Sequence, residues 1–337
     1  MELKTKSIVK KKKPIWKKIF IGFVSIILLV LAFGISYEAI ASYQGIKKYP
    51  AEGKLVDVGD FKLHINKMGE GKPTIILEAA SGASSTIWKD IPEELSEIGT
   101  VVTYDRGGYA WSEKATTERT GENIVNELYT ALKEEEIEGP YIVVGHSLGG
   151  MYARLFAQTY KEEVAGVVLV DSRHEDYSKE TNPIIEAAGH DPALMGMPSK
   201  TLINLLKVTG VVRLLGESDT REEQITMNIE GRSKFFHARE DELRNIDQVE
   251  DSIRNHSLGD IPLTIMTHGI PIDSTPFGIS KENSDKMEEI WQEQQKQMLN
   301  LSTNSELIVA ENSGHFIIHD EPELVINEIK EMVGKIK

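Results

Sequence analysis

The chain has 337 residues, of which 40% are hydrophobic and 27% charged, so it contains enough apolar material for a sizeable folded core. It has no cysteine, which excludes disulfide frameworks, zinc–thiolate and iron–sulfur sites, and cysteine nucleophiles. The formal net charge of −15 argues against nucleic acid as a main partner, because such binding needs a positive surface.

The amino terminus has the pattern of a membrane element. Residues 1–18 form a basic arm with eight lysines and one acidic residue, and residues 19–37 follow without a charged side chain. As a helix, this apolar stretch would be about 28 Å long, close to the roughly 30 Å thickness of the hydrocarbon layer. We therefore predict a transmembrane signal-anchor over 19–37. The basic arm would stay in the cytoplasm, and the body of this single-pass cell-membrane protein would lie outside.

A cleavable signal peptide is the alternative to an anchor. Ala39 and Ala41 give the small-x-small form of a cleavage site, and cleavage after Ala41 would release a secreted body. The apolar run is longer than the 7–15 residues usual in the core of a signal peptide, which favours the anchor.

After a linker expected over 38–53, short apolar runs alternate with amphipathic segments. The runs predict strands at 54–58, 62–67, 74–79, 100–105, 141–145, 164–171, 262–268 and 306–310. The longer segments predict helices at 86–98, 121–136, 148–160, 281–301 and 322–337. Continuous apolar strands that alternate with helices predict an α/β fold, with a mostly parallel sheet covered by helices on both faces.

Residues 172–260 interrupt this alternation, because they show helical patterns and no convincing strand. We predict that they form a helical cap, inserted into a core made of residues 54–171 and 261–337. Ligands of such sheets bind at the carboxyl ends of the strands, where a cap would cover them. An apolar face within the cap, such as residues 202–215, favours acyl esters or lipid-like substrates over peptides.

Residues 145–149 read Gly-His-Ser-Leu-Gly, which fits the pattern G-x-S-x-G between an expected strand and an expected helix. A sharp turn there would present Ser147 as a nucleophile, and the glycines would leave room for the turn. The amides at the start of the following helix would favour a developing oxyanion.

A serine nucleophile needs a base, and His315 is the candidate among nine histidines. It follows the last expected strand, so its loop reaches the same sheet edge as Ser147. His146 is adjacent to the nucleophile, but its side chain should point away from it. His315 and His319 have the spacing of a metal pair, but no third ligand is evident near them. We predict neither a metal nor a cofactor.

Five segments, in chain order, resemble the serine hydrolases of the α/β-hydrolase fold. They are residues 77–88, 104–112, 143–153, 167–172 and 313–325. The chain is identified as a membrane-anchored, bacterial-type member of this superfamily. The resemblance implies the family order of nucleophile, acid and histidine, with Ser147 first and His315 last.

The resemblance also implies an oxyanion hole formed by two backbone amides. One belongs to Leu148, and the other to Ala80 or Ser81 in the loop after the third strand. Glu78-Ala79 stands where the family commonly has His-Gly, so this loop departs from the pattern. Epoxide hydrolases and haloalkane dehalogenases of the same fold use aspartate as nucleophile, and Ser147 argues against both.

Two aspartates compete for the role of the acid. Most family members carry the acid after the strand that here ends at His268, but the usual spacing falls on Ile272, one residue before Asp273. Other members carry it after the preceding strand, where Asp171 stands. We favour Asp171, because a strand end holds a carboxylate rigidly.

The sequence thus predicts a serine hydrolase that cleaves a carboxylic ester or lipid-like acyl ester of a small molecule through Ser147, His315 and Asp171. A prolyl-type aminopeptidase is one alternative, with acidic residues of the cap holding the substrate amine. The candidates for that contact are Glu222, Glu223, Glu240, Asp241 and Glu242. A catalytically idle receptor or signalling module is the other alternative. No oligomeric state is predicted.

Overall fold

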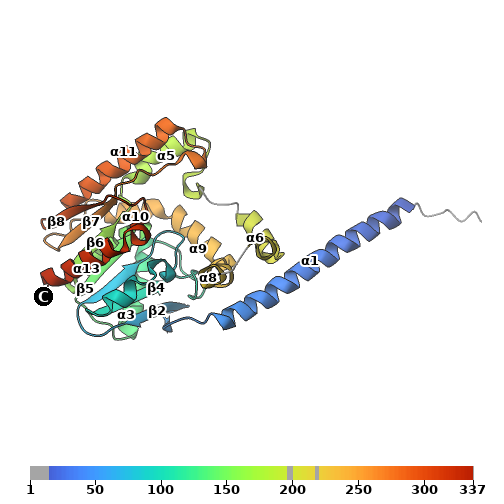
Figure 1. Cartoon of the computed structure of the whole chain (residues 1–337), viewed down its shortest axis with the longest axis horizontal. Coiled ribbons are helices and arrows are strands. Elements are labelled where there is room, and N and C mark those ends of the chain that lie inside the picture. The colour runs from blue at the N-terminus through green and yellow to red at the C-terminus, as the bar shows by residue number, and fades with distance from the viewer. Residues whose placement is uncertain (1–14, 196–199, 217–219, 337) are drawn as a thin grey trace, which may run out of the picture.

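The computed structural model describes residues 15–195, 200–216 and 220–336. Figure 1 shows an α/β body from which one long helix extends at the amino-terminal side. Most of the predicted basic arm, residues 1–14, lies outside the described residues.

The body is built on one eight-stranded sheet with the order β1-β2-β4-β3-β5-β6-β7-β8. The first two strands are antiparallel, and β3 to β8 run parallel. Every predicted strand is confirmed, and each end lies within one residue of its expected position. The strands are β1 (Lys54–Asp57), β2 (Lys62–Met68), β3 (Thr74–Glu78), β4 (Thr100–Asp105), β5 (Tyr141–His146), β6 (Val164–Val170), β7 (Leu263–His268) and β8 (Ser305–Ala310).

Helices cover both faces of the sheet, as its continuous apolar strands require. One apolar core lies between the sheet and α3 (Gly121–Glu134), α4 (Leu148–Thr159) and α10 (Ile246–Ile253). A second core lies on the other face, under α2 (Ile91–Leu95), α12 (Ile317–Asp320) and α13 (Pro322–Ile336). Near β7, α11 (Lys281–Gln297) packs against α5 (Tyr177–Ala187). The 3-10 turns of the core are η1 (Ser85–Trp88), η2 (Lys161–Glu163), η5 (Thr275–Phe277) and η6 (Met298–Leu301).

The helix predicted over 86–98 is divided into η1 and α2. Lys89 between them has a φ of 45°, which no helix accommodates, and Pro92 has no amide hydrogen for a continuing helix. The helix predicted over 281–301 likewise ends as α11 at Gln297 and continues as the 3-10 turn η6.

Residues 172–260, here called the insertion, contain helices and no strand among the described residues. The apolar stretch 201–215 forms two helices rather than one, because Gly210 between them has a φ of 76°. The helices that precede α10 are α5, η3 (Pro192–Leu194), α6 (Lys200–Val208), α7 (Val211–Leu215), α8 (Arg221–Ile225), the π-helix η4 (Thr226–Glu230) and α9 (Ser233–Arg244).

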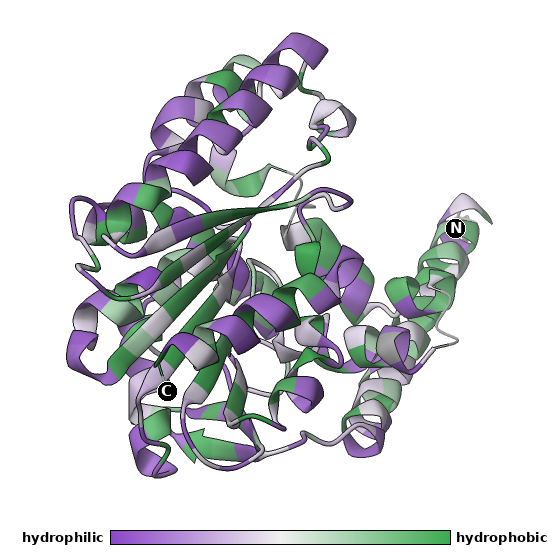
Figure 2. Cartoon of the chain, turned by 60° about the vertical axis from the view of Figure 1, so that its left-hand side comes forward, coloured by the Kyte–Doolittle hydropathy of each residue, from purple (hydrophilic) through white to green (hydrophobic). Residues whose placement is uncertain are grey.

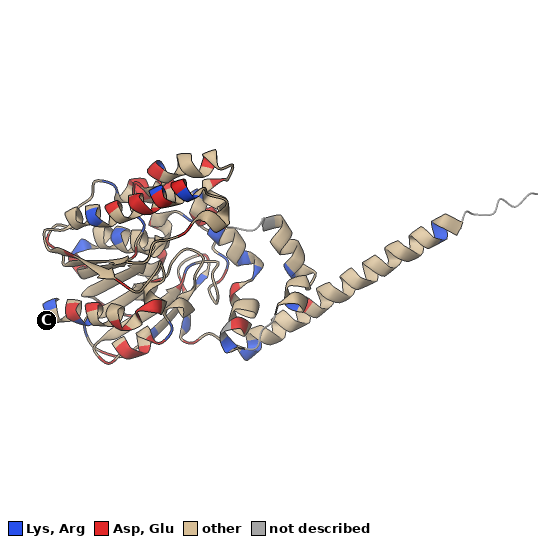
Figure 3. Cartoon of the chain, turned by 45° about the horizontal axis from the view of Figure 1, so that its top comes forward, with Lys and Arg blue, Asp and Glu red and all other residues tan. Residues whose placement is uncertain are grey.

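The amino-terminal helix α1 (Ile15–Lys48) is longer than the predicted apolar span. It is the one described helix that is long and apolar enough to cross a membrane. Figure 3 shows a long stretch free of charge between a basic residue near its start and the charged residues near the body, and Figure 2 shows its hydrophobic character. The prediction of a linker over 38–53 is wrong as far as Lys48, because Glu38 and Gly45 are buried against the insertion and the helix continues past them.

Candidate active site

Ser147 occupies a strained turn between β5 and α4. Its backbone has φ 57° and ψ −121°, a conformation that side chains other than glycine rarely adopt. A Cβ atom on Gly145 would lie 2.5 Å from the carbonyl oxygen of Gly149, and one on Gly149 would lie 2.5 Å from that of Ala79. Close backbone packing on two sides of the turn therefore explains why glycine is needed at both positions.

The structure brings Ser147, His315 and Asp171 into one hydrogen-bonded row. The Ser147 hydroxyl donates to Nε2 of His315 across 2.9 Å, and Nδ1 of His315 donates to Oδ2 of Asp171 across 2.6 Å. Asp171 directly follows β6 and is fully buried, whereas the His315 side chain is 25% exposed. Ser147 is also only partly buried, so a substrate can reach the Ser147 end of the row.

Asp273, the competing acid, lies elsewhere. Its carboxylate accepts hydrogen bonds from the backbone amide and the hydroxyl of Thr275, each across 3.0 Å, and it is exposed on its own loop. Of the two aspartates, Asp171 is therefore the one that contacts His315.

The Asp171 carboxylate is surrounded by donors. Nδ1 of His268 lies 2.8 Å from both of its oxygens, and Nε1 of Trp291 donates to Oδ1 across 3.0 Å. Burial opposes the charge, but the hydrogen bonds from His268 and His315 outweigh it and hold the pKa of Asp171 well below its usual range. The carboxylate therefore stays ionised while it orients His315.

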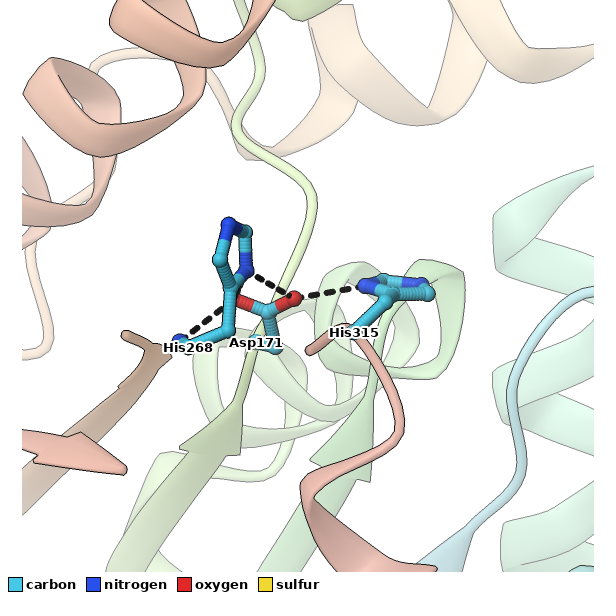
Figure 4. Close-up of side chains that lie close together, drawn as sticks. All are labelled: Asp171, His268 and His315. Atoms are coloured by element: carbon cyan, nitrogen blue, oxygen red, sulfur yellow. Dashed lines mark hydrogen bonds and ion pairs between the residues drawn. The ribbon is translucent and has the colours of Figure 1, made fainter. Parts of the chain in front are cut away.

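His268 is a site residue that the sequence reasoning missed. Its Nε2 donates to Oε1 of Glu288 across 2.9 Å, so both ring nitrogens face carboxylates. Burial opposes protonation, but the hydrogen bonds to Asp171 and Glu288 outweigh it and raise the pKa of His268 to about 9. Figure 4 shows His268 and His315 on opposite sides of Asp171. The available signal was its place at the end of β7, beside the strand that carries Asp171.

The coordinating atoms of Asp171, His268 and His315 lie within 4.8 Å of one another, a grouping that could hold a metal ion. Hydrogen bonds account for the grouping, because one nitrogen of each histidine already donates to the carboxylate between them. A cation there would have to replace both of these protons. His319, the other histidine considered as a ligand, instead contacts the carbonyl oxygen of Ile87 across 2.9 Å.

His146 supports the loop that carries His315. Its Nε2 donates to the backbone carbonyl oxygen of His315 across 2.8 Å. Burial, with a smaller contribution from the nearby His315, lowers the pKa of His146 to about 3, so its ring is neutral. The residue next to the nucleophile thus positions the backbone of His315.

The two segments expected to form an oxyanion hole lie side by side. Leu148 begins α4, and Ala80 lies in the loop after β3 that Gly149 approaches closely. Arg106 holds this loop, since it donates to the carbonyl oxygens of Ala79 and Ala80 across 2.7 and 2.9 Å. With the carbonyls turned to Arg106, the loop has a defined orientation beside the first turn of α4.

Arg106 also joins the insertion to this loop. It is buried between Glu78, at 2.6 Å, and Glu242 of α9, at 3.1 Å, and Glu242 accepts a further hydrogen bond from Tyr109. Burial opposes the charge of Arg106, but Glu242 and Glu78 outweigh it and raise its pKa well above the ordinary value. Arg106 lies in the segment 104–112 that carries the family resemblance, yet the sequence indicated no role for it.

Comparisons with known proteins agree with this architecture. The family model described as "alpha/beta hydrolase fold" matches residues 73–196. The chain is similar to the uncharacterized protein YqjL of Bacillus subtilis, with 29% identity over 77% of this chain and 83% of the relative. It is also similar to an AB hydrolase superfamily protein of Gibberella zeae, with 25% identity over 79% of this chain and 88% of the relative.

Solved structures show the same fold. One is a thermophilic esterase from Thermogutta terrifontis, with a TM-score of 0.56 and 18% identity over 85% of this chain and 99% of the esterase. The parallel sheet, the turn at Ser147 and the matched family model agree with one another. The chain therefore has the α/β-hydrolase fold.

Proposed function

We propose that this protein is a serine hydrolase that cleaves carboxylic esters of small molecules through an acyl-enzyme on Ser147. The observation that carries the proposal is the hydrogen-bonded row from Ser147 through His315 to Asp171. In this mechanism His315 accepts the serine proton as the hydroxyl attacks the carbonyl carbon. Asp171 keeps the imidazole in the tautomer that can accept this proton.

The amides of Leu148 and Ala80 would stabilise the tetrahedral oxyanion. Electrostatic stabilisation by fixed donors is commonly the largest single contribution in acyl transfer. His315 would then return its proton to the leaving alcohol. A water molecule, activated by the same histidine, would release the acid and restore Ser147.

A fluorophosphonate probe tests the proposal directly, since it reacts with activated serines. We expect stoichiometric labelling of Ser147, no labelling in Ser147→Ala, and a sharp reduction in His315→Ala. Thr303→Ala, an exposed change at the opposite end of the sheet, is the control. An unlabelled Ser147 in folded protein would favour the idle-receptor alternative.

The aminopeptidase alternative receives less support from the insertion. Glu242 is buried and already binds Arg106 and Tyr109, so it is not available to a substrate amine. Glu223 accepts a hydrogen bond from the Thr220 amide, and Glu240 accepts one from Arg244. A panel of acyl esters and aminoacyl amides separates the two activities, and we expect turnover of the esters.

We also propose that α1 remains attached as a membrane anchor, with the catalytic body outside the cytoplasm. Glu38 of α1 contacts Arg213 across 2.7 Å and Lys207 across 3.5 Å, and both cations belong to the insertion. Cleavage after Ala41 would remove Glu38 and leave both cations without this counter-charge, which favours the uncleaved form.

Two measurements test this topology. The protein in the membrane fraction should have the mass of the full-length chain. Protease added to intact protoplasts should digest the body. A soluble product that begins at residue 42 would contradict the anchor, and a fully protected body would contradict its orientation.

A further inference from the structure

The helices α6 and α7 of the insertion, with the turn between them, form a hairpin that lies against α1. Gly34 of α1 meets the backbone of Thr209 so closely that a Cβ atom on Gly34 would collide with its carbonyl oxygen. From the other side, a Cβ on Gly210 would lie 3.0 Å from the carbonyl oxygen of Gly34. The two backbones are therefore in direct contact at the turn of the hairpin.

This contact determines how far the hairpin reaches along α1. Gly34 lies three residues before the end of the uncharged stretch at Tyr37, which is about 4.5 Å along the helix axis. Glu38, just past that end, holds the hairpin through Arg213 and Lys207. Ser42, one turn further, accepts a hydrogen bond from Arg213 across 3.2 Å. The turn of the hairpin thus lies beside the end of the apolar span of α1. The polar contacts of the hairpin, with Glu38 and Ser42, lie just past the end of that span.

The outer surface of the hairpin is apolar. Five large apolar side chains are at least half exposed: Leu202, Leu205, Val208, Leu214 and Leu215. Beyond Lys200, the first residue of α6, the hairpin has two charged residues, Lys207 and Arg213. Both are turned toward Glu38, with side chains 11% and 10% exposed. From residue 201 to residue 215, the surface turned away from α1 therefore presents leucine and valine without a charge.

Water is a poor solvent for such a surface, and lipid is a good one. Contiguous exposed apolar side chains mark contact with a protein or a membrane. The position of the contact along α1 favours the membrane, because the turn of the hairpin lies beside a segment of α1 whose large apolar side chains are exposed. A largely apolar cavity of about 460 Å³ lies behind the hairpin. Its lining includes Ile203, Val212, Met227 and Phe236, together with the charged residues Lys207 and Glu223.

We propose that the α6–α7 hairpin is embedded in the outer leaflet of the membrane that α1 crosses. The body would then be attached to the bilayer at two places rather than tethered by α1 alone. This inference rests on the proposed anchor. It makes amphiphilic acyl esters that reside in that leaflet the substrate class nearest to the enzyme.

The absence of cysteine makes a direct test possible, because single cysteines can be introduced into the full-length chain without a background. Leu205→Cys and Leu214→Cys report on the hairpin, and Ile27→Cys reports on the anchor itself. Val309→Cys on β8, with an original side chain 43% exposed, is the matched control on the body. Each protein is labelled with an NBD fluorophore and reconstituted into vesicles of phosphatidylcholine and phosphatidylglycerol, with or without nitroxide-bearing acyl chains.

We expect nitroxide lipids to quench the labels at positions 27, 205 and 214 several-fold more than the label at 309. Added dithionite should reduce the label at 309 rapidly and the labels at 205 and 214 several-fold more slowly. Reduction at 309 also measures the fraction of protein whose body faces outward, which normalises the other three values.

Quenching at 27 with rapid dithionite reduction at 205 and 214 would overturn the inference and leave the anchor intact. Protection at 205 and 214 without quenching by lipid would also overturn it, because a second copy of the chain or another protein would then cover the leucines. Absence of quenching at 27 would contradict the anchor, and the inference would fail with it.

Discussion

His268 and Asp171 share a buried ionic contact in which Nδ1 of the histidine lies 2.8 Å from both carboxylate oxygens. Asp171 directly follows β6, and His268 ends the neighbouring parallel strand β7. The backbone amide of His268 also faces Oδ1 of Asp171, at 3.3 Å. Asp171 therefore receives hydrogen bonds from one histidine that would take part in the reaction and from another that would not. His268 is in turn held by Glu288, so alternating charges extend from Glu288 of α11 to Asp171. Hydrogen bonds continue from Asp171 through His315 to Ser147.

We predict that His268 positions the carboxylate of Asp171. His268→Gln should lower kcat about tenfold or more, because a hydrogen bond to a charged group is worth about 1.5–3 kcal/mol. KM should change little, since the ring does not face the substrate. Glu288→Gln is the matched variant. It keeps an oxygen for His268 while removing the charge, so its loss should be smaller.

A purely structural role for His268 would predict a different result. The pH profile of kcat separates the two roles, because the wild-type rate should fall at alkaline pH as His268 loses its proton. That decline should move to lower pH in Glu288→Gln and disappear in His268→Gln. An unchanged alkaline profile in both variants would contradict the positioning role.

The same ionic contact should make stability depend on pH. The pKa of His268 is raised from an ordinary 6.5 to about 9 in the folded protein, so the folded state binds its proton more tightly than the unfolded state. This contribution to stability is fully present below about pH 6.5 and is lost as the pH rises through 9. Asp171 and Glu288, the charged groups that face the ring, remain ionised over this range. We expect the Tm in detergent to fall between these values in the wild type, and the fall to be smaller in His268→Gln.

The two candidate acids can be separated by matched substitutions. Asp171→Asn should lower kcat by several orders of magnitude, because an amide in place of the carboxylate leaves His315 in a tautomer that cannot accept the serine proton. Asp273→Asn should have little effect, because that carboxylate is exposed and bonds to Thr275 within its own loop. A crippling effect of Asp273→Asn beside a nearly silent Asp171→Asn would reverse the assignment.

Glu38 should stabilise the contact between α1 and the insertion. Glu38→Gln leaves Arg213 and Lys207 partly buried without their counter-charge, so we expect a loss of about 1–3 kcal/mol and a lower Tm in detergent. Glu52→Gln is the control, because its ion pair with Arg221 is exposed and should contribute about 0–1 kcal/mol. Equal effects of the two substitutions would show that the Glu38 contact does not stabilise the folded protein.

Much of this architecture follows from local sequence patterns. Continuous runs of β-branched residues predict buried parallel strands. The predicted strand ends lie close to the observed ends, because burial on both faces allows few polar residues inside a run. Gly145, Ser147 and Gly149 are recognisable from sequence because they are close together in the chain and the backbone of the turn itself demands glycine. The choice of Asp171 also follows from its place at a strand end.

Contacts between distant segments could not be predicted in this way. The partners of Asp171 include His268, 97 residues away, and Trp291, 120 residues away, and no local pattern links them. The same holds for Arg106, which meets Glu242 across 136 residues. Glu38 of α1 likewise contacts Arg213, 175 residues away. Periodicity reports which face of an element is buried, whereas the identity of the group that it meets is decided by the packing of elements that are remote in sequence.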